Sequence, residues 1–170
     1  MPSSRTIFTI GHSNHSLDAF LALLARHQIA QVADVRRAPY CEYAVEFNRE
    51  VLQESLKQVG ISYHYLGDTL GGVRSSTRHR SPDFAALWEA ANESPEFREG
   101  LSEVEALAEE GPVAILCAEG EPANCHRHWI VARALTQRGA RVLHILPDGS
   151  LHEPTPAEFL PRGGQLCLTD

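Results

Sequence analysis

Short apolar or β-branched runs alternate with segments of helical periodicity along most of this chain. The runs predict strands, and hydrophobic residues spaced three and four apart predict helices between them. Strands are expected at residues 6–10, 31–35, 61–66, 113–117 and 142–146. Helices are expected after Ser16, a typical N-cap residue, and at about residues 47–59, 82–91, 95–109 and 124–138.

This alternation favours an α/β fold of three layers, Rossmann-like or flavodoxin-like, in which a mostly parallel sheet of about five strands is flanked by helices. The run at residues 113–117 is continuously apolar, as in a strand that is buried on both faces. We expect one domain over residues 1–170, with its core at about 6–146. A tail at 147–170, with several prolines and glycines, completes it.

Composition narrows the class of protein. Hydrophobic residues make up 43% of the 170 and charged residues 22%, which is typical of a globular protein. No apolar run approaches the roughly 20 residues of a membrane span, so we expect a cytoplasmic protein without membrane contact. The net charge of −7 makes extended nucleic acid an unlikely partner. We expect free thiols at Cys41, Cys117, Cys125 and Cys167.

Polar residues cluster where the predicted strands end. In open α/β sheets the loops at the carboxyl ends of the strands line the ligand crevice. We therefore expect several distant segments to meet at one sheet edge. These are His12, Ser13 and Asn14; Asp34, Arg36 and Arg37; Gly71, Gly72 and Arg74; and the stretch from Cys117 to Arg127.

The stretch from Cys117 to Arg127 holds two thiols. Asn124 can cap the following helix, which places Cys125, His126 and Arg127 in its first turn. The backbone N–H groups and dipole there favour an anion and lower the pKa of a thiol. We therefore predict that Cys125 is the more reactive cysteine and that Cys117 is a small buried residue at the edge of the core, although Cys125 could equally be structural.

These groups suggest an enzyme-like site for a small anionic or nucleotide-type ligand, its reaction unknown. Arg36 and Arg127 would hold the anion as planar charged forks. His12 and Asp34 would act as acid or base or orient the substrate, with Cys125 as a possible nucleophile. The remaining predicted ligand contacts are Ser13, Asn14, Cys117, Glu119 and His126. Glu119 would orient Arg127 or His126. Structural roles stay open, since Asp34 could cap a loop or pair with Arg36 and His12 could be a turn residue.

Comparison of the sequence with the motifs of known enzymes excludes most specific reactions. A cysteine phosphatase loop needs arginine six positions after its cysteine, where this chain has Ala123. A rhodanese-type sulfur-transfer loop, which would begin at Cys117, is a weaker alternative. The chain has no CxxC, GxGxxG or Walker motif. The seven residues between Cys117 and Cys125 do not fit the short spacing of structural zinc sites. We predict no metal site, and metal-dependent hydrolysis also stays a weaker alternative.

A noncatalytic module that binds a nucleotide or a nucleic-acid end is the main alternative. Tyr40, Tyr43 and Tyr65 could stack on a base while arginines contact phosphate. A basic cluster would then be either a solvated loop or a surface that steers a phosphate-bearing substrate. It consists of Arg74, Arg78, His79 and Arg80. The sequence specifies neither a cofactor nor an oligomeric state.

Several motifs together resemble one known family. They are Thr9-Ile-Gly-His-Ser13 with Asn14, Asp34-Val-Arg36, Leu70-Gly-Gly72, Cys117-Ala-Glu119 and Cys125-His-Arg127. In this order and over residues 6 to about 146, the chain resembles the DUF488 family. The resemblance implies a compact α/β fold without an established activity, with the shared polar motifs at the crevice. Residues 37–46 depart from the serine- and arginine-bearing loop that is common in the family.

Overall fold

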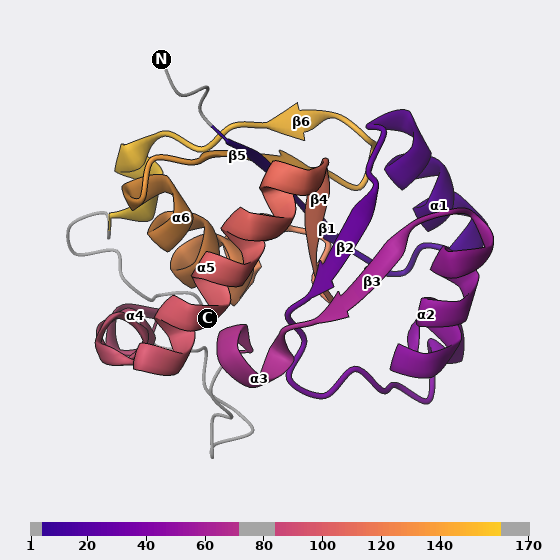
Figure 1. Ribbon diagram of the computed structural model, residues 1–170, viewed down its shortest axis with the longest axis horizontal. Coiled ribbons are helices and arrows are strands. Elements are labelled where there is room, and N and C mark those ends of the chain that lie inside the picture. The colour runs from indigo at the N-terminus through magenta and orange to yellow at the C-terminus, as the bar shows by residue number, and fades with distance from the viewer. Residues whose placement is uncertain (1–4, 72–83, 161–170) are drawn as a thin grey trace.

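The computed structural model describes residues 5–71 and 84–160. A six-stranded sheet forms its centre, with helices on both faces (Figure 1). The strands are β1 Thr6–Gly11, β2 Gln31–Asp34, β3 Ser62–Tyr65, β4 Val113–Cys117, β5 Arg141–Ile145 and β6 Leu151–His152. The α-helices are α1 Leu17–Arg26, α2 Arg49–Gln58, α3 Gly67–Leu70, α4 Phe84–Glu93, α5 Pro95–Glu110 and α6 Arg133–Gln137. Among the residues that the structure describes, no helix is long and apolar enough to cross a membrane.

The strand order is β3-β2-β4-β1-β5-β6, with all neighbours parallel except the last pair. The predicted α/β class with three layers is therefore confirmed. The order differs from the Rossmann order 3-2-1-4-5-6 because β4 lies between β2 and β1. The antiparallel strand β6 lies in the tail, where the sequence pattern predicted no element.

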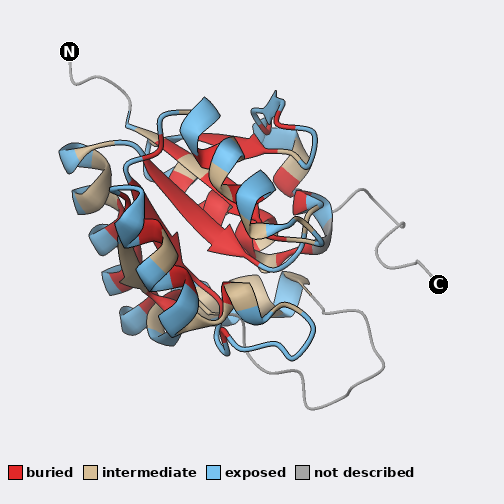
Figure 2. Ribbon diagram, turned by 90° about the vertical axis from the view of Figure 1, so that its right-hand side faces the viewer, coloured by how far each residue is buried: buried red, intermediate tan, exposed pale blue. Residues whose placement is uncertain are grey.

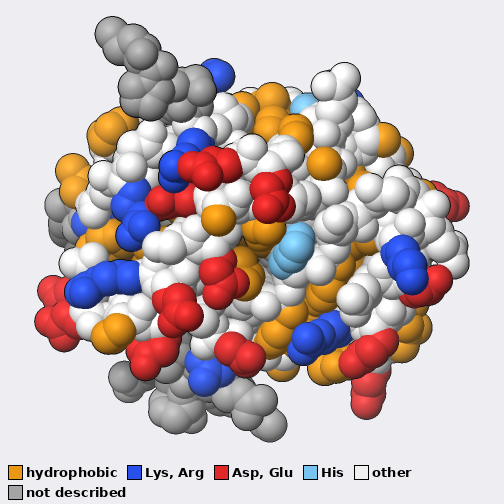
Figure 3. Space-filling view, viewed as in Figure 1, with side chains coloured by type: hydrophobic (Ala, Val, Ile, Leu, Met, Phe, Trp, Pro, Cys, Tyr) orange, Lys and Arg blue, Asp and Glu red, His pale blue; other side chains and the backbone are white. Residues whose placement is uncertain are grey.

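Two apolar layers hold the helices to the sheet. On one face α1 and α2 pack through Phe20, Leu24, Leu52 and Leu56, and on the other α5 and α6 pack with the segment before α6. Every residue of β4 is buried, as its unbroken apolarity predicted. Figure 2 shows the buried strands between helices whose outward sides are exposed. Acidic and basic side chains are interspersed on the face shown in Figure 3.

Local signals explain most element ends. The Ser16 hydroxyl accepts a hydrogen bond from the Ala19 N–H, so Ser16 caps α1 as predicted. Gly60, just beyond α2, has a φ of +80°, which favours glycine. A short 3-10 turn at Val45–Phe47 precedes α2, so the α-helix itself begins two residues later than expected.

The region predicted as one helix at 124–138 is divided. A 3-10 turn covers Pro122–Asn124, a π-helical stretch covers Arg127–Ala132, and α6 follows. Cys125 is extended, and its carbonyl accepts hydrogen bonds from the N–H groups of His128 and Trp129. The continuous helical stretch that leads into α6 therefore begins after Cys125 rather than at Asn124. Gly72, the predicted basic cluster at Arg74, Arg78, His79 and Arg80, and Cys167 lie outside the described residues.

Candidate functional site

Three of the predicted loops meet at the carboxyl edge of the sheet. Because β4 lies between β2 and β1, its end is flanked by both of their loops. The His12 N–H donates to the Cys117 carbonyl over 3.0 Å, and the Ser13 N–H donates to the Ala118 carbonyl over 2.9 Å. On the other side the Val35 N–H donates to the Leu116 carbonyl over 3.0 Å. The edge holds two polar clusters, one around Asp34 and one around Cys117.

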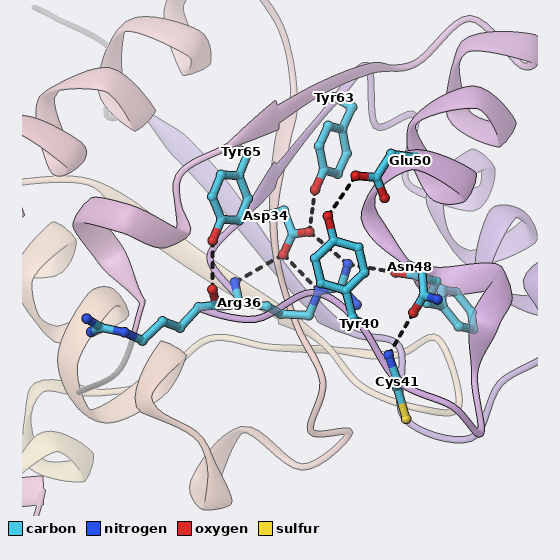
Figure 4. Close-up of polar contacts among 10 residues, drawn as sticks. Asp34, Arg36, Tyr40, Cys41, Asn48, Glu50, Tyr63 and Tyr65 are labelled. Atoms are coloured by element: carbon cyan, nitrogen blue, oxygen red, sulfur yellow. Dashed lines mark hydrogen bonds and ion pairs between the residues drawn. The ribbon is translucent and has the colours of Figure 1, made fainter. Parts of the chain in front are cut away.

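The first cluster is a buried ion pair between Asp34 and Arg36 (Figure 4). The guanidinium donates from Nε to Oδ1 over 2.9 Å and from Nη2 to Oδ2 over 2.8 Å. The Arg36 N–H also donates to Oδ1, and the Tyr63 hydroxyl donates to Oδ2 over 2.6 Å. Burial lowers the pKa of Arg36, but bonding to Asp34 outweighs it and raises this pKa overall. Asp34 and Arg36 therefore pair with each other, which is one of the structural roles that the sequence left open for Asp34.

Other groups complete this cluster. Arg36 Nη2 also donates to the Phe47 carbonyl over 2.8 Å. The Phe47 ring stacks on His12, with ring centroids 4.7 Å apart. Burial, followed by the charge of Arg36, lowers the pKa of His12, so a neutral imidazole is favoured. Beyond it, Ser13 is partly buried and Asn14 exposed. All the guanidinium contacts of Arg36 that the structure describes are therefore with groups inside the protein.

The second cluster surrounds Arg127, whose side chain is completely buried. Its Nε donates to the Thr9 hydroxyl over 3.2 Å, and Nη2 donates to the Gly120 carbonyl over 3.1 Å. Nη1 donates to the Cys117 sulfur over 2.6 Å and also to the Glu119 carbonyl. Within residues 5–71 and 84–160 no carboxylate pairs with this guanidinium.

The two predicted site cysteines are in contact. Cys117 Sγ and Cys125 Sγ lie 2.8 Å apart, and the two residues are 2% and 4% exposed. The Arg127 N–H donates to Cys125 Sγ over 3.4 Å, as expected for a side chain at a helix start. Both are free thiols, as is the exposed Cys41.

The electrostatics reverse the expected order of the two thiols. Burial raises the pKa of Cys117, but hydrogen bonding from Cys125 and the charge of Arg127 lower it to about 7. The hydrogen bond to Cys117, together with burial, raises the pKa of Cys125. The helix start was expected to favour a thiolate at Cys125, but the guanidinium lies against Cys117 instead. Cys117 therefore has the lower pKa of the two thiols, and the two sulfurs share a hydrogen bond.

The other predicted contacts of this segment also differ. Glu119 was expected to orient Arg127 through its carboxylate, but its side chain is exposed and its backbone carbonyl makes the contact. His126 Nδ1 lies 3.8 Å from Cys125 Sγ. His126 Nε2 is buried and has no hydrogen-bond partner among the described residues. Burial lowers the pKa of His126, so its ring is neutral near pH 7.

The close approach of the Glu119 backbone explains why position 11 of the Thr9–Ser13 motif is a glycine. A Cβ atom on Gly11 would lie 1.7 Å from the Glu119 carbonyl oxygen and 2.8 Å from Arg127 Nη1. Any larger residue at this position would therefore displace the loop that Arg127 holds. The glycine lets the ends of β1 and β4 lie together around the buried guanidinium.

Sequence reasoning missed a buried polar chain behind Arg127. The Thr9 hydroxyl is 2.6 Å from His144 Nδ1, and His144 Nε2 is 3.0 Å from His128 Nδ1. Burial, then the charges of His128 and Arg127, lower the pKa of His144 to about 3. The only sequence signals were polar residues inside apolar runs, at Thr9 in β1 and His144 in β5.

The geometry offers little to a metal. The described residues contain no group of three or more histidine, cysteine or acidic side chains that could hold an ion.

A small cavity of about 30 Å³ lies beside His126, lined by Leu70, Phe97 and Ile130 among others. It is large enough for one or two small atoms rather than for a nucleotide.

A sheet of this kind, flanked by helices on both faces, defines an α/β protein with a thiol pair and a buried arginine at the carboxyl edge of its sheet. The family model described as Domain of unknown function DUF488 matches residues 16–134, and the chain belongs to this family. The predicted family is thereby confirmed over residues 16–134, a range that begins after the Thr9–Asn14 motif. No curated protein and no solved structure matches the chain.

Proposed function

We propose that this protein is an enzyme-like domain whose reactive group is the Cys117 thiolate at the carboxyl end of β4. The observation that carries the proposal is the buried guanidinium of Arg127, which contacts Cys117 Sγ and has no carboxylate partner in the described part of the chain. A buried positive charge without an anion is costly, and the thiolate supplies that anion. A thiolate is also the nucleophilic form of cysteine.

This proposal moves the nucleophile from Cys125 to Cys117. It also changes the role of the arginines, because Arg36 bonds Asp34 and Arg127 bonds the Cys117 loop. An anionic ligand held by both arginines would have to displace these partners. Attack by Cys117 on a small electrophile at the same edge needs no such displacement.

The thiolate can be tested by its ultraviolet absorbance near 240 nm during a pH titration. In wild type we expect a step with a pKa of about 7 that is missing in Cys117→Ser. Cys41→Ser is the matched control, because Cys41 is an exposed free thiol and its removal should leave the step in place. A wild-type titration without any step below the ordinary thiol range would refute the proposal.

A noncatalytic nucleotide-binding module is a second candidate, favoured by one observation. Tyr43 is 95% exposed and Tyr40 is 55% exposed on the loop that follows Arg36, where rings could stack on a base. Tyr65 is less suited, because the Arg49 guanidinium covers its ring at 4.1 Å. Thermal shift with phosphate, sulfate and a nucleotide panel tests this. Stabilisation by a nucleotide that Tyr43→Ala abolishes and Cys117→Ser retains would favour the module.

A further inference from the structure

The two buried sulfurs at the sheet edge have unequal chemistry and lie in direct contact. Arg127 Nη1 donates to Cys117 Sγ over 2.6 Å, which favours the thiolate there, while burial and the contact with Cys117 raise the pKa of Cys125. A sulfur that has been oxidised at Cys117 would find the second thiol 2.8 Å away. Such a pair, with one attacking and one resolving thiol, is arranged for two-electron oxidation.

Access to the pair limits the oxidant by size. The two cysteines are 2% and 4% exposed, so a bulky disulfide reagent cannot reach either sulfur unless the loop between Cys117 and Cys125 opens. The cavity of about 30 Å³ beside His126 is lined by neither cysteine and reaches only the residue next to Cys125. Hydrogen peroxide, with two heavy atoms, is small enough for a space of this size.

We propose that Cys117 and Cys125 form a peroxide-reactive dithiol site that closes to an intrachain disulfide. The inference rests on the proposed function, because it needs the Cys117 thiolate. In the first step the thiolate attacks one oxygen of hydrogen peroxide. The S–O bond forms, the O–O bond breaks, hydroxide leaves, and Cys117 becomes a sulfenic acid.

In the second step the Cys125 sulfur attacks the Cys117 sulfur. The S–S bond forms, the S–O bond breaks, and the hydroxyl group leaves as water with the Cys125 proton. Overall the dithiol is oxidised by two electrons and the peroxide is reduced. The neutral His126 ring, 3.8 Å from Cys125 Sγ, is placed to receive the thiol proton on its way to the leaving group. A small dithiol reductant returns the pair to thiols once the loop opens.

Arg127 acts before and after the reaction in this scheme. Its Nη1 donates to Cys117 Sγ and so holds the thiolate before attack. After the disulfide forms, the guanidinium loses its anion, and its remaining partners in the described part of the chain are neutral acceptors, namely Thr9 and the Glu119 and Gly120 carbonyls. Oxidation therefore weakens the interactions that hold the Cys117 loop.

The experiment uses the full chain with Cys41→Ser and Cys167→Ser, so that only the pair can react. After hydrogen peroxide treatment and alkylation of the unfolded protein, peptide mass spectrometry should find a Cys117–Cys125 disulfide that dithiothreitol removes. With Cys125→Ser added, dimedone that is present while the peroxide-treated protein is unfolded should trap a sulfenic acid at Cys117. With Cys117→Ser added, neither product should form. The rate should rise about tenfold between pH 6 and pH 8 as the thiolate forms.

The outcomes separate the two proposals. A titration step near pH 7 without any peroxide-induced link would overturn the dithiol site and leave the Cys117 thiolate intact. The absence of that step would overturn both. Disulfide formation that is as fast with oxidised glutathione as with hydrogen peroxide would overturn the assignment of a peroxide as oxidant.

Discussion

Replacing Cys117 by alanine should cost more stability at alkaline than at acidic pH. The folded pKa of Cys117 is about 7, against an ordinary value of 9.0. Because folding lowers this pKa, the unfolded chain binds more protons between pH 7 and 9, and stability rises with pH over that interval. Below the interval both states hold a neutral thiol, so the ionisation contributes nothing there.

The size of the effect follows from the shift. At about pH 8.5 the folded thiol is ionised while the unfolded one is mostly protonated. At 1.36 kcal/mol per pKa unit, this difference is worth about 2 kcal/mol. At about pH 6 it is worth close to nothing. The packing lost with the sulfur adds a constant to both values, so the pH dependence isolates the thiolate.

Urea unfolding with a phosphine reductant measures this, with the fluorescence of Trp88 and Trp129 as the signal. Cys41→Ala is the matched control and should show no pH dependence relative to wild type. The measurements should stay below about pH 9, because the raised pKa of Cys125 makes stability fall again above that value. A Cys117→Ala penalty that is equal at both pH values would show that Cys117 is a neutral thiol.

Three further predictions concern the surroundings of the site. Asp34→Asn should destabilise the protein by about 3–5 kcal/mol in urea unfolding, because it leaves Arg36 buried without an anion. The free energy of unfolding should fall as the pH drops below about 6.5. The unfolded chain then takes up a proton at His144, whereas the folded protein, in which the pKa of His144 is about 3, does not. A His144→Gln variant should lose part of this pH dependence in an acid titration followed by circular dichroism. Gly11→Ala should prevent normal folding, whereas Gly60→Ala, with open space but a φ of +80°, should lower the melting temperature only by the few degrees that correspond to about 1 kcal/mol.

Apolar periodicity was enough to predict the sheet and most of its helices. The five parallel strands lie within one residue of their predicted ends because each is a short run rich in apolar, β-branched or aromatic residues between polar segments. The tail strand Leu151–His152 is too short and too exposed to leave such a pattern. The placement of β4 between β2 and β1 also has no local signal, since it depends on how the helices cross the sheet.

The candidate site was predicted in its location but not in its internal pairing. The strand-end rule brought Asp34, Cys117 and Arg127 to one edge, and the Asp34–Arg36 pair was among the alternatives. The choice between Cys117 and Cys125 depended on where a single guanidinium points. That direction is set by Thr9 and by two backbone carbonyls, which no spacing rule contains.

The position of β4 also constrains the order in which the protein can form. In the described structure β1 pairs only with β4 and β5, so a ribosome-bound chain of about 110 residues contains β1 without either neighbour. Only β2 and β3 can pair in that nascent chain. β1 therefore stays unpaired, and its apolar residues remain exposed to solvent until β4 inserts between β2 and β1. Because β4 ends at Cys117, this thiol reaches the sheet edge in the same event that joins β1 to β2 and β3.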